Sequence, residues 1–167
     1  MACTNCNKKP IWEFTNKTKL CKNCFTDYFE RKIFRTIRKY RLLPKSRIIK
    51  IKKSADINTK VLVNVLQKKF KIEFSKNPDI SPKNLSESAE DIFLNLLKGR
   101  FKSKTFDKKS QPLLFLSDKE IEVYAKINNI KGKSRTKNKK AALLFEKFTL
   151  KNPDLEHNIL NAFSQLD

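Results

Sequence analysis

Four cysteines are the residues of this sequence whose type and spacing point most clearly to chemistry. Cys3 and Cys6 form one CxxC pair, and Cys21 and Cys24 form a second. Two such pairs can converge on one tetrahedral ion, and a structural zinc site needs four soft ligands with no open position. The spacing therefore predicts a zinc ribbon over residues 1–26. We expect it to be unfolded without metal, because so short a segment buries too little surface to fold alone.

An iron centre and a thiol redox couple are the alternative interpretations of the same four cysteines. Iron also accepts four thiolates but is rarer in this arrangement. A redox couple needs only one CxxC pair and leaves the second pair unexplained. We therefore predict structural Zn²⁺ on Cys3, Cys6, Cys21 and Cys24.

A basic amphipathic helix is predicted after the ribbon, over residues 27–43, because apolar residues recur there at steps of three and four. The chain carries a net charge of +21 at pH 7, which attracts polyanions because each phosphate contact releases counterions. A lysine-rich composition, attachment to an acidic membrane surface or a solvated helix face would explain the same charge without RNA, but clustering of the basic residues favours RNA. The candidate RNA-binding residues are Arg31, Lys32, Arg35, Arg38, Lys39, Lys98, Arg100, Lys102, Lys104, Lys131, Lys133 and Arg135.

The remainder, residues 44–167, is predicted to be an α/β domain. Strands at 47–52 and 71–74 flank a helical stripe, and this β-α-β order implies a parallel pair with a crossover helix, the start of a reduced doubly wound sheet. Helices are also expected at 85–97, from 117 behind a capping box, at 141–148 and beyond 152–153, with another strand at 112–116. The chain has one histidine, His157, for which we expect a structural role.

The N-terminal residues and the length of the apolar runs indicate in which cell compartment we expect the protein. No apolar run approaches the roughly 20 residues that span a bilayer, and the first residues lack the apolar stretch of a signal peptide. We therefore expect a cytoplasmic protein without a membrane partner, in which thiols stay reduced and bind metal readily.

At this point the residues suggest a family. The cysteine pairs, the basic helix and the segments NLSESAEDIFLNLLKGR and QPLLFLSDKEIEVYA together resemble the tRNA 2-thiolation enzymes. These are the wobble-uridine and ribothymidine thiolases of the ATP-pyrophosphatase (PP-loop) group. The resemblance implies a zinc ribbon that helps to hold tRNA. It also implies an α/β domain that, in active members, adenylates a uridine carbonyl and replaces its oxygen with sulfur.

The chain departs from this family at the nucleotide loop. The family sequence is Ser-Gly-Gly-Lys-Asp-Ser, whose glycines let backbone amides close around the ATP phosphates. Side chains replace both glycines here, an aspartate brings negative charge, and an isoleucine stands in for the lysine. ATP binding in the family's manner is therefore not expected. The matching positions are Ser54, Ala55, Asp56, Ile57, Asn58 and Thr59.

Two further departures concern polar and sulfur chemistry. A family Gly-His-Asn-Leu-Asp-Asp stretch corresponds to residues 82–87, which keep only Asn84 and Leu85. Active members carry additional cysteines in the α/β domain, for a sulfur-transfer pair or an iron-sulfur cluster, and their second, C-terminal cysteine module is also missing here. This chain has no cysteine after Cys24, so we expect no iron-sulfur cluster.

These departures predict a pseudoenzyme. The leading expectation is a non-catalytic tRNA-binding subunit that supports an active thiolase homologue in wobble-uridine modification. One alternative is a repurposed module that binds ribosomal or other structured RNA. Another is an enzyme with altered chemistry, for which the sequence offers no replacement site.

Overall fold

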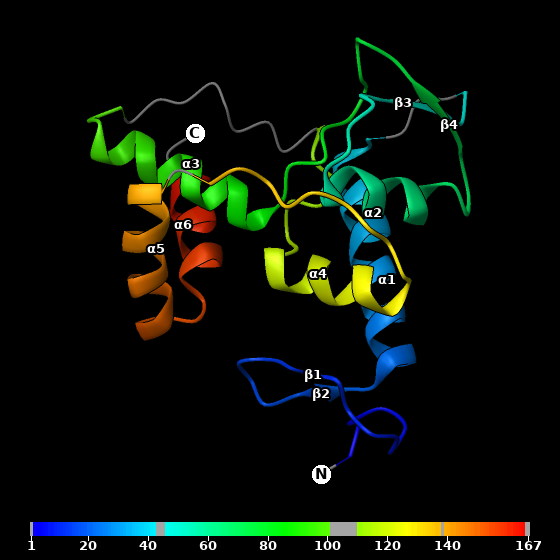
Figure 1. Cartoon of the computed structure of the whole chain (residues 1–167), viewed down its shortest axis with the longest axis horizontal. Coiled ribbons are helices and arrows are strands. Elements are labelled where there is room, and N and C mark those ends of the chain that lie inside the picture. The colour runs from blue at the N-terminus through cyan, green and yellow to red at the C-terminus, as the bar shows by residue number, and fades with distance from the viewer. Residues whose placement is uncertain (1, 43–45, 101–109, 138, 166–167) are drawn as a thin grey trace.

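The computed structural model describes residues 2–42, 46–100, 110–137 and 139–165 (Figure 1). Lys102 and Lys104, two of the predicted RNA-binding residues, lie outside these ranges. The described ranges form a small four-cysteine ribbon, a β-α-β unit with two helices packed on it, and a second group of three helices.

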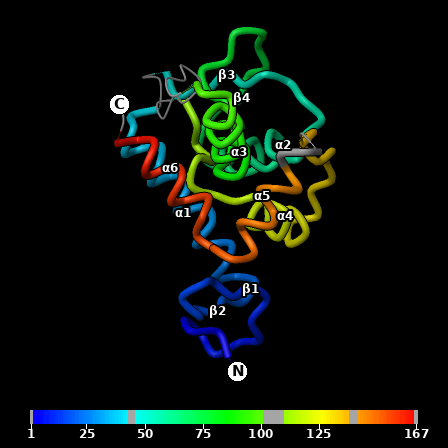
Figure 2. Tube along the Cα trace, turned by 90° about the vertical axis from the view of Figure 1, so that its left-hand side faces the viewer, coloured from blue at the N-terminus to red at the C-terminus, as the bar shows by residue number. Residues whose placement is uncertain are grey.

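The ribbon contains an antiparallel hairpin of β1 (Trp12–Glu13) and β2 (Lys19–Leu20), in which Trp12 faces Leu20. It forms a separate lobe at the N-terminal end of the molecule (Figure 2). Helix α1 (Lys22–Tyr40) begins inside this lobe, so the predicted boundary between residues 26 and 27 falls within a continuous helix.

Helix α1 is the central element of the main core. Phe25, Phe29, Ile33 and Ile37 are fully buried and lie on one face of the helix, as their spacing predicts. Phe29 stacks on Tyr124 with ring centroids 4.2 Å apart. One hydrophobic cluster therefore connects the ribbon to the α/β domain.

The predicted β-α-β unit is confirmed. Strands β3 (Ile48–Ile51) and β4 (Lys71–Phe74) pair in parallel, and helix α2 (Ile57–Leu66) crosses between them. Their register places Ile48 opposite Lys71 and Ile51 opposite Phe74. Ile80 adds a single parallel bridge to Ile51, so the described sheet is small, as expected for a reduced α/β fold.

The remaining helices lie on both sides of this unit. Helix α4 (Asp118–Ile127) packs on α1 and α2, and its predicted capping box is present, with Ser117 and Glu120 bonded reciprocally. Helices α3 (Leu85–Leu97), α5 (Lys139–Lys151) and α6 (Leu155–Phe163) form the second group, at the left in Figure 1.

The strand predicted at 112–116 is wrong. These residues form successive turns, in which the N–H of Leu114 donates to Gln111 and the N–H of Leu116 to Leu113. Leu113 and Leu116 are buried in the main core, whereas Leu114 is buried in the second one. A short apolar run cannot distinguish a buried strand from a buried turn that connects two cores.

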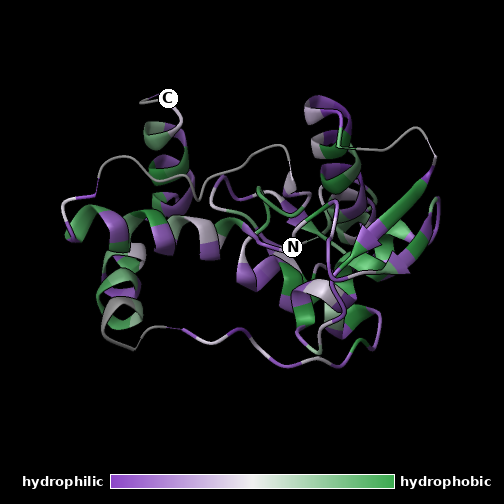
Figure 3. Cartoon of the chain, turned by 90° about the horizontal axis from the view of Figure 1, so that it is seen from above, coloured by the Kyte–Doolittle hydropathy of each residue, from purple (hydrophilic) through white to green (hydrophobic). Residues whose placement is uncertain are grey.

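Hydropathy follows this architecture. Hydrophobic residues, green in Figure 3, concentrate in the helices and strands, while the connecting segments are largely hydrophilic. None of the helices in the described ranges combines the length and apolar character needed to cross a membrane.

Candidate metal centre and nucleic-acid interface

The four cysteine sulfur atoms meet at one point. All lie within 4.8 Å of one another, with 3.3 Å between Cys6 and Cys21 and 3.5 Å between Cys6 and Cys24. Zinc–sulfur bonds of about 2.3 Å in a tetrahedron place sulfur atoms about 3.8 Å apart. The observed spacing brackets that value, so the four thiols fit one tetrahedral ion.

Local backbone structure positions the two cysteine pairs differently. Cys3 and Cys6 lie in a tight turn, where the N–H of Asn7 donates to the Cys3 carbonyl and Asn7 has a left-handed φ of 57°. Cys21 is the N-cap of α1, and Cys24 lies in the first turn of that helix. The helix dipole favours thiolates at this end, which suits metal ligation.

The clustered thiols perturb one another. Burial opposes ionisation of Cys3, but backbone N–H groups of Cys21, Asn5 and Cys6 outweigh it and lower the pKa of this thiol to about 6. The neighbouring Cys6 thiol and burial raise the pKa of Cys24 to about 12. Four thiolates this close together repel one another, so all four can be ionised only if a cation lies between them. A bound metal ion is such a cation.

The predicted basic face of α1 is an exposed stripe. Arg31, Arg35 and Arg38 are exposed and recur at steps of four and three, on the side opposite the buried face. They span about 10 Å along the axis at a rise of 1.5 Å per residue. None of these three arginines takes part in an ion pair with any described residue. We call Arg31, Arg35 and Arg38 the α1 stripe.

Lysines from the α2–β4 corner lie beside the stripe. The Nζ of Lys69 lies 4.4 Å from the ring centroid of Phe34, and Lys68 pairs with Glu30 at 2.5 Å. Sequence reasoning missed Lys69 because the contact joins residues far apart in the chain. Phe34 of α1 also packs against Phe70, with ring centroids 6.5 Å apart. Phe70 is next to Lys69, so this contact brings the segment between α2 and β4 against α1.

Two of the predicted RNA-binding residues are engaged internally. Lys32 donates to the Tyr28 hydroxyl at 2.6 Å and lies 3.3 Å from Glu120. Arg135 lies 2.5 Å from Glu90 and 3.1 Å from Asp118, with only 15% of its side chain exposed. These contacts indicate structural roles in holding α1, α3 and α4 together.

The remaining predicted basic residues lie in separate places. Lys39 is exposed and lies over the rings of Tyr40 and Phe115. Lys98 and Arg100 are exposed just after α3, which lies on the other side of Figure 1 from α1. Lys131 and Lys133 are exposed near the start of α2. The members of the predicted set that lie in the described ranges therefore do not form one continuous surface.

The segment matching the nucleotide loop is covered by another part of this chain. The N–H of Ile57 donates to the Lys133 carbonyl at 2.9 Å, and the N–H of Lys133 donates to Ala55 at 2.9 Å. Lys60 donates to the Lys131 carbonyl at 2.7 Å. Gly132 permits this approach, since a Cβ there would lie 2.7 Å from the Ile57 Cα. Residues 131–133 thus close over the N-terminus of α2.

Asp56 is the N-cap of α2, and its side chain accepts hydrogen bonds from Thr59 in the first turn of this helix. Its carboxylate accepts from the N–H of Thr59 at 2.7 Å and from the Thr59 hydroxyl at 2.7 Å. Burial opposes ionisation, but hydrogen bonds from Ser54 and Thr59 outweigh it and lower the pKa of Asp56. An N-cap carboxylate satisfies the donors that an anion-binding helix terminus presents to a phosphate.

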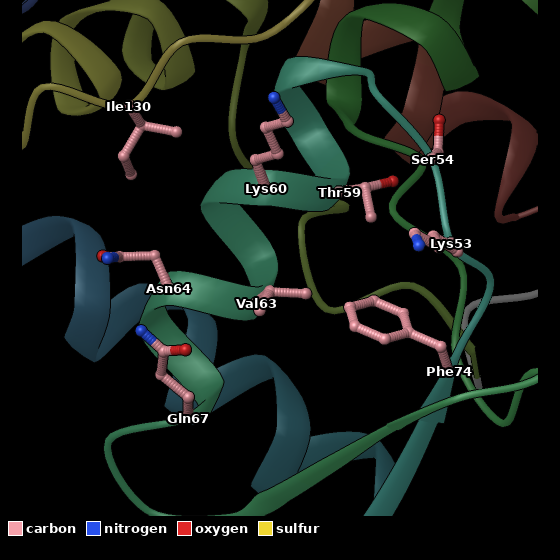
Figure 4. Close-up of a pocket in the computed structure, with 9 residues that line it drawn as sticks. All are labelled: Lys53, Ser54, Thr59, Lys60, Val63, Asn64, Gln67, Phe74 and Ile130. Carbon is pink, nitrogen blue, oxygen red and sulfur yellow. The ribbon is translucent and has the colours of Figure 1, made fainter.

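A shallow groove of about 320 Å³ lies along the outer face of α2 (Figure 4). Val63, Phe74 and Ile130 give it a mainly apolar lining, with Lys53 and Lys60 at its margin. Phe74 ends β4 and is 56% exposed. Thr59, which also lines the groove, uses its backbone N–H within the chain, on Asp56.

The ribbon, the β-α-β unit and the helical group define an α/β protein with an N-terminal four-cysteine module. No model of a known protein family matches the sequence, and no curated protein matches it. Among solved structures, it is similar to the U34-tRNA thiolase NcsA from Methanococcus maripaludis with its [4Fe-4S] cluster. The TM-score is 0.79 at 12% identity, over 99% of this chain and 87% of that one. A likeness at this identity shows the fold.

Proposed function

We propose that this chain is a zinc-containing, non-catalytic RNA-binding subunit related to tRNA 2-thiolation, which supports an active thiolase homologue. The fold of a U34-tRNA thiolase over nearly the whole chain supports the link to tRNA. The α1 stripe supplies exposed cations for the RNA backbone.

The closed N-terminus of α2 is the observation that carries the non-catalytic part of the proposal. A phosphate-binding loop needs free backbone N–H groups at a helix N-terminus. Here Ile57 donates to Lys133 and Thr59 donates to Asp56, so both donors are used within the chain. The Asp56 carboxylate also places a negative charge beside the position that a nucleotide phosphate would occupy.

The cysteine count supports the loss of sulfur chemistry. All four thiols converge on one site, and the chain has no cysteine after Cys24. An iron-sulfur cluster places several iron and sulfide atoms between its thiolates, which then lie farther apart than around one ion. Sulfur atoms within 4.8 Å of one another therefore favour a single tetrahedral ion over a cluster, and we assign this ion as zinc.

The zinc ion has a structural task in this proposal. Bound zinc is a closed four-thiolate site that supplies folding free energy to the ribbon. Cys21 and Cys24 belong to α1, so the metal fixes the start of this helix relative to the hairpin. The α1 stripe then projects from a rigid element, as a backbone-tracking surface requires.

Deletion of the gene, followed by mass spectrometry of tRNA nucleosides, tests the proposal. We expect 2-thiouridine to fall, and we expect the purified chain to co-purify with tRNA and a larger thiolase homologue. Unchanged thiolation in the deletion strain would contradict the proposed pathway. Co-purification with ribosomes instead would favour the repurposed RNA-binding module.

A further inference from the structure

The outer face of α5 is unusually apolar. Two large hydrophobic side chains are exposed there, with Leu143 63% and Leu150 78% exposed. Leu144 adds a further 39% exposed side chain. Leu97, which is 60% exposed, ends α3, the helix against which α5 packs.

The helix is apolar on its inner side as well. Phe145 is buried, and its ring lies 5.5 Å from that of Phe93 on α3. At 3.6 residues per turn, Leu143 lies nearly opposite Phe145, and Leu150 returns to the side of Leu143. A helix that is hydrophobic on both sides is normally covered on both. Phe148 lies on the inner side too, with its ring centroid 6.1 Å from that of Phe93. We call Leu143 and Leu150, with Leu144 beside them, the α5 face.

Basic side chains near the α5 face indicate the charge of a surface that could pack on it. Lys147 and Lys151 are exposed between and beside the leucines, whereas Glu146 is the exposed acid of α5. Lys98 and Arg100 follow Leu97 directly and are also exposed. No ion pair joins any of these four cations to a residue within the described ranges. The covering surface must therefore supply both apolar and acidic groups.

A second copy of this chain is a poor candidate. Each copy carries a net charge of +21, so the α5 face would meet a like-charged surface. An RNA backbone offers the negative charge but no aliphatic groups for the leucines. An acidic amphipathic helix offers both, because its apolar ridge packs between the rows of a facing helix and its flanking carboxylates reach lysines.

We propose that the α5 face is the docking site for an acidic amphipathic helix of a partner protein. Leu143 and Leu150 receive its apolar ridge, and Lys147 and Lys151 pair with its carboxylates. This inference stands independently of RNA binding, since it uses none of the α1 stripe.

Fluorescence anisotropy with a defined probe tests the proposal. The probe is a labelled 21-residue synthetic helix with leucine on one face and glutamate on the other, titrated with the full zinc-loaded chain. We expect binding that weakens about tenfold in the Leu143→Ser/Leu150→Ser double variant, as for loss of central apolar anchors. A Lys147→Glu/Lys151→Glu variant should also lose affinity. Phe74→Ser, which removes another exposed aromatic far along the chain, is the matched control and should not change binding.

Three further results would overturn the proposal. The first is equal binding of a probe in which lysine replaces every glutamate. The second is sedimentation with phosphatidylglycerol vesicles that is lost in the double leucine variant, since this would assign the face to a membrane. The third is a concentration-dependent dimer that the same variant abolishes, since this would assign the face to a second copy.

Discussion

At the scale of single residues, two clusters determine what this chain can do. The four cysteines combine a tight turn with the first turn of a helix, so one ion can join both. Arg135 lies between Glu90 and Asp118, and Asn84 donates to Asp118 at 2.7 Å. The first cluster can bind an ion, and the second joins the loop that carries Arg135 to α3 and α4.

Loss of a metal ligand should release the zinc. In Cys24→Ser the site keeps three thiolates, and we expect zinc content to fall from one ion per chain to nearly none, with unfolding of the ribbon. Asn23→Ser, an exposed neighbour in the same pair, should keep its zinc. Elemental analysis of the purified proteins measures this directly. Iron with visible absorbance in the wild-type chain would contradict the zinc assignment.

Loss of the buried guanidinium should destabilise the domain. Arg135→Met leaves Glu90 buried without its partner, and we expect a loss of about 3 kcal/mol in urea unfolding at pH 7. Lys137, which pairs with Asp118 but is half exposed, is the control, and Lys137→Met should cost less than about 1 kcal/mol. Equal effects of the two substitutions would contradict the assigned role of Arg135.

The same network predicts how stability depends on pH. Burial opposes ionisation of Asp118, but Asn84, Arg135 and Lys137 outweigh it and lower its pKa. Because the folded pKa lies below the unfolded value of about 3.9, this contribution is fully present above that pH and is lost as pH falls through the folded pKa. The difference in unfolding free energy between the wild-type protein and Arg135→Met should therefore become smaller as the pH falls below about 4.

At the scale of elements, residues 131–133 pack on the start of α2, the helix end that the proposed function treats as closed to a nucleotide. The contact consists of two backbone hydrogen bonds and the lysine bond from Lys60. It depends on Gly132, which lies against the backbone of Ile57. Sequence reasoning found both segments but assigned Lys131, Lys133 and Arg135 to RNA contact, because no local pattern shows that a distant loop packs on a helix end.

Substitution of Gly132 should disturb this contact. In Gly132→Ala the new Cβ would lie 2.7 Å from the Ile57 Cα, a distance that requires the backbone to move. We expect a loss of about 1–3 kcal/mol in unfolding free energy, typical of overpacking. Ser134→Ala, two residues along the same exposed segment, should change stability little. Wild-type stability of the glycine variant would mean that the loop does not hold this position in solution.

Charge reversal on α1 should weaken RNA binding. Arg35→Glu/Arg38→Glu removes two phosphate contacts, so we expect lower affinity for tRNA and a salt dependence whose slope falls by roughly 2. Lys119→Glu/Lys126→Glu changes the net charge equally on the exposed face of α4 and serves as the control. Filter binding at several salt concentrations gives both values. An unchanged slope in the α1 variant would show that the helix face is only solvated.

At the scale of the whole molecule, much of the fold could be predicted because its signals are local. The CxxC spacing, the apolar stripe of α1 and the Ser117–Glu120 capping box each lie within one element, and all were found. The strand expected at 112–116 was wrong because burial there comes from two separate cores. Long-range placement determined the rest: Arg135 became internal only through contacts with Glu90 and Asp118.

The proposed function holds that this chain binds RNA and does not carry out the adenylation step, and the closed start of α2 supports its second part. Release of AMP from ATP in the presence of tRNA measures the adenylation step most directly. We expect the purified zinc-loaded chain to bind tRNA and release no AMP above background, with or without a sulfur donor. AMP release that depends on tRNA and scales with the concentration of this chain would contradict the account.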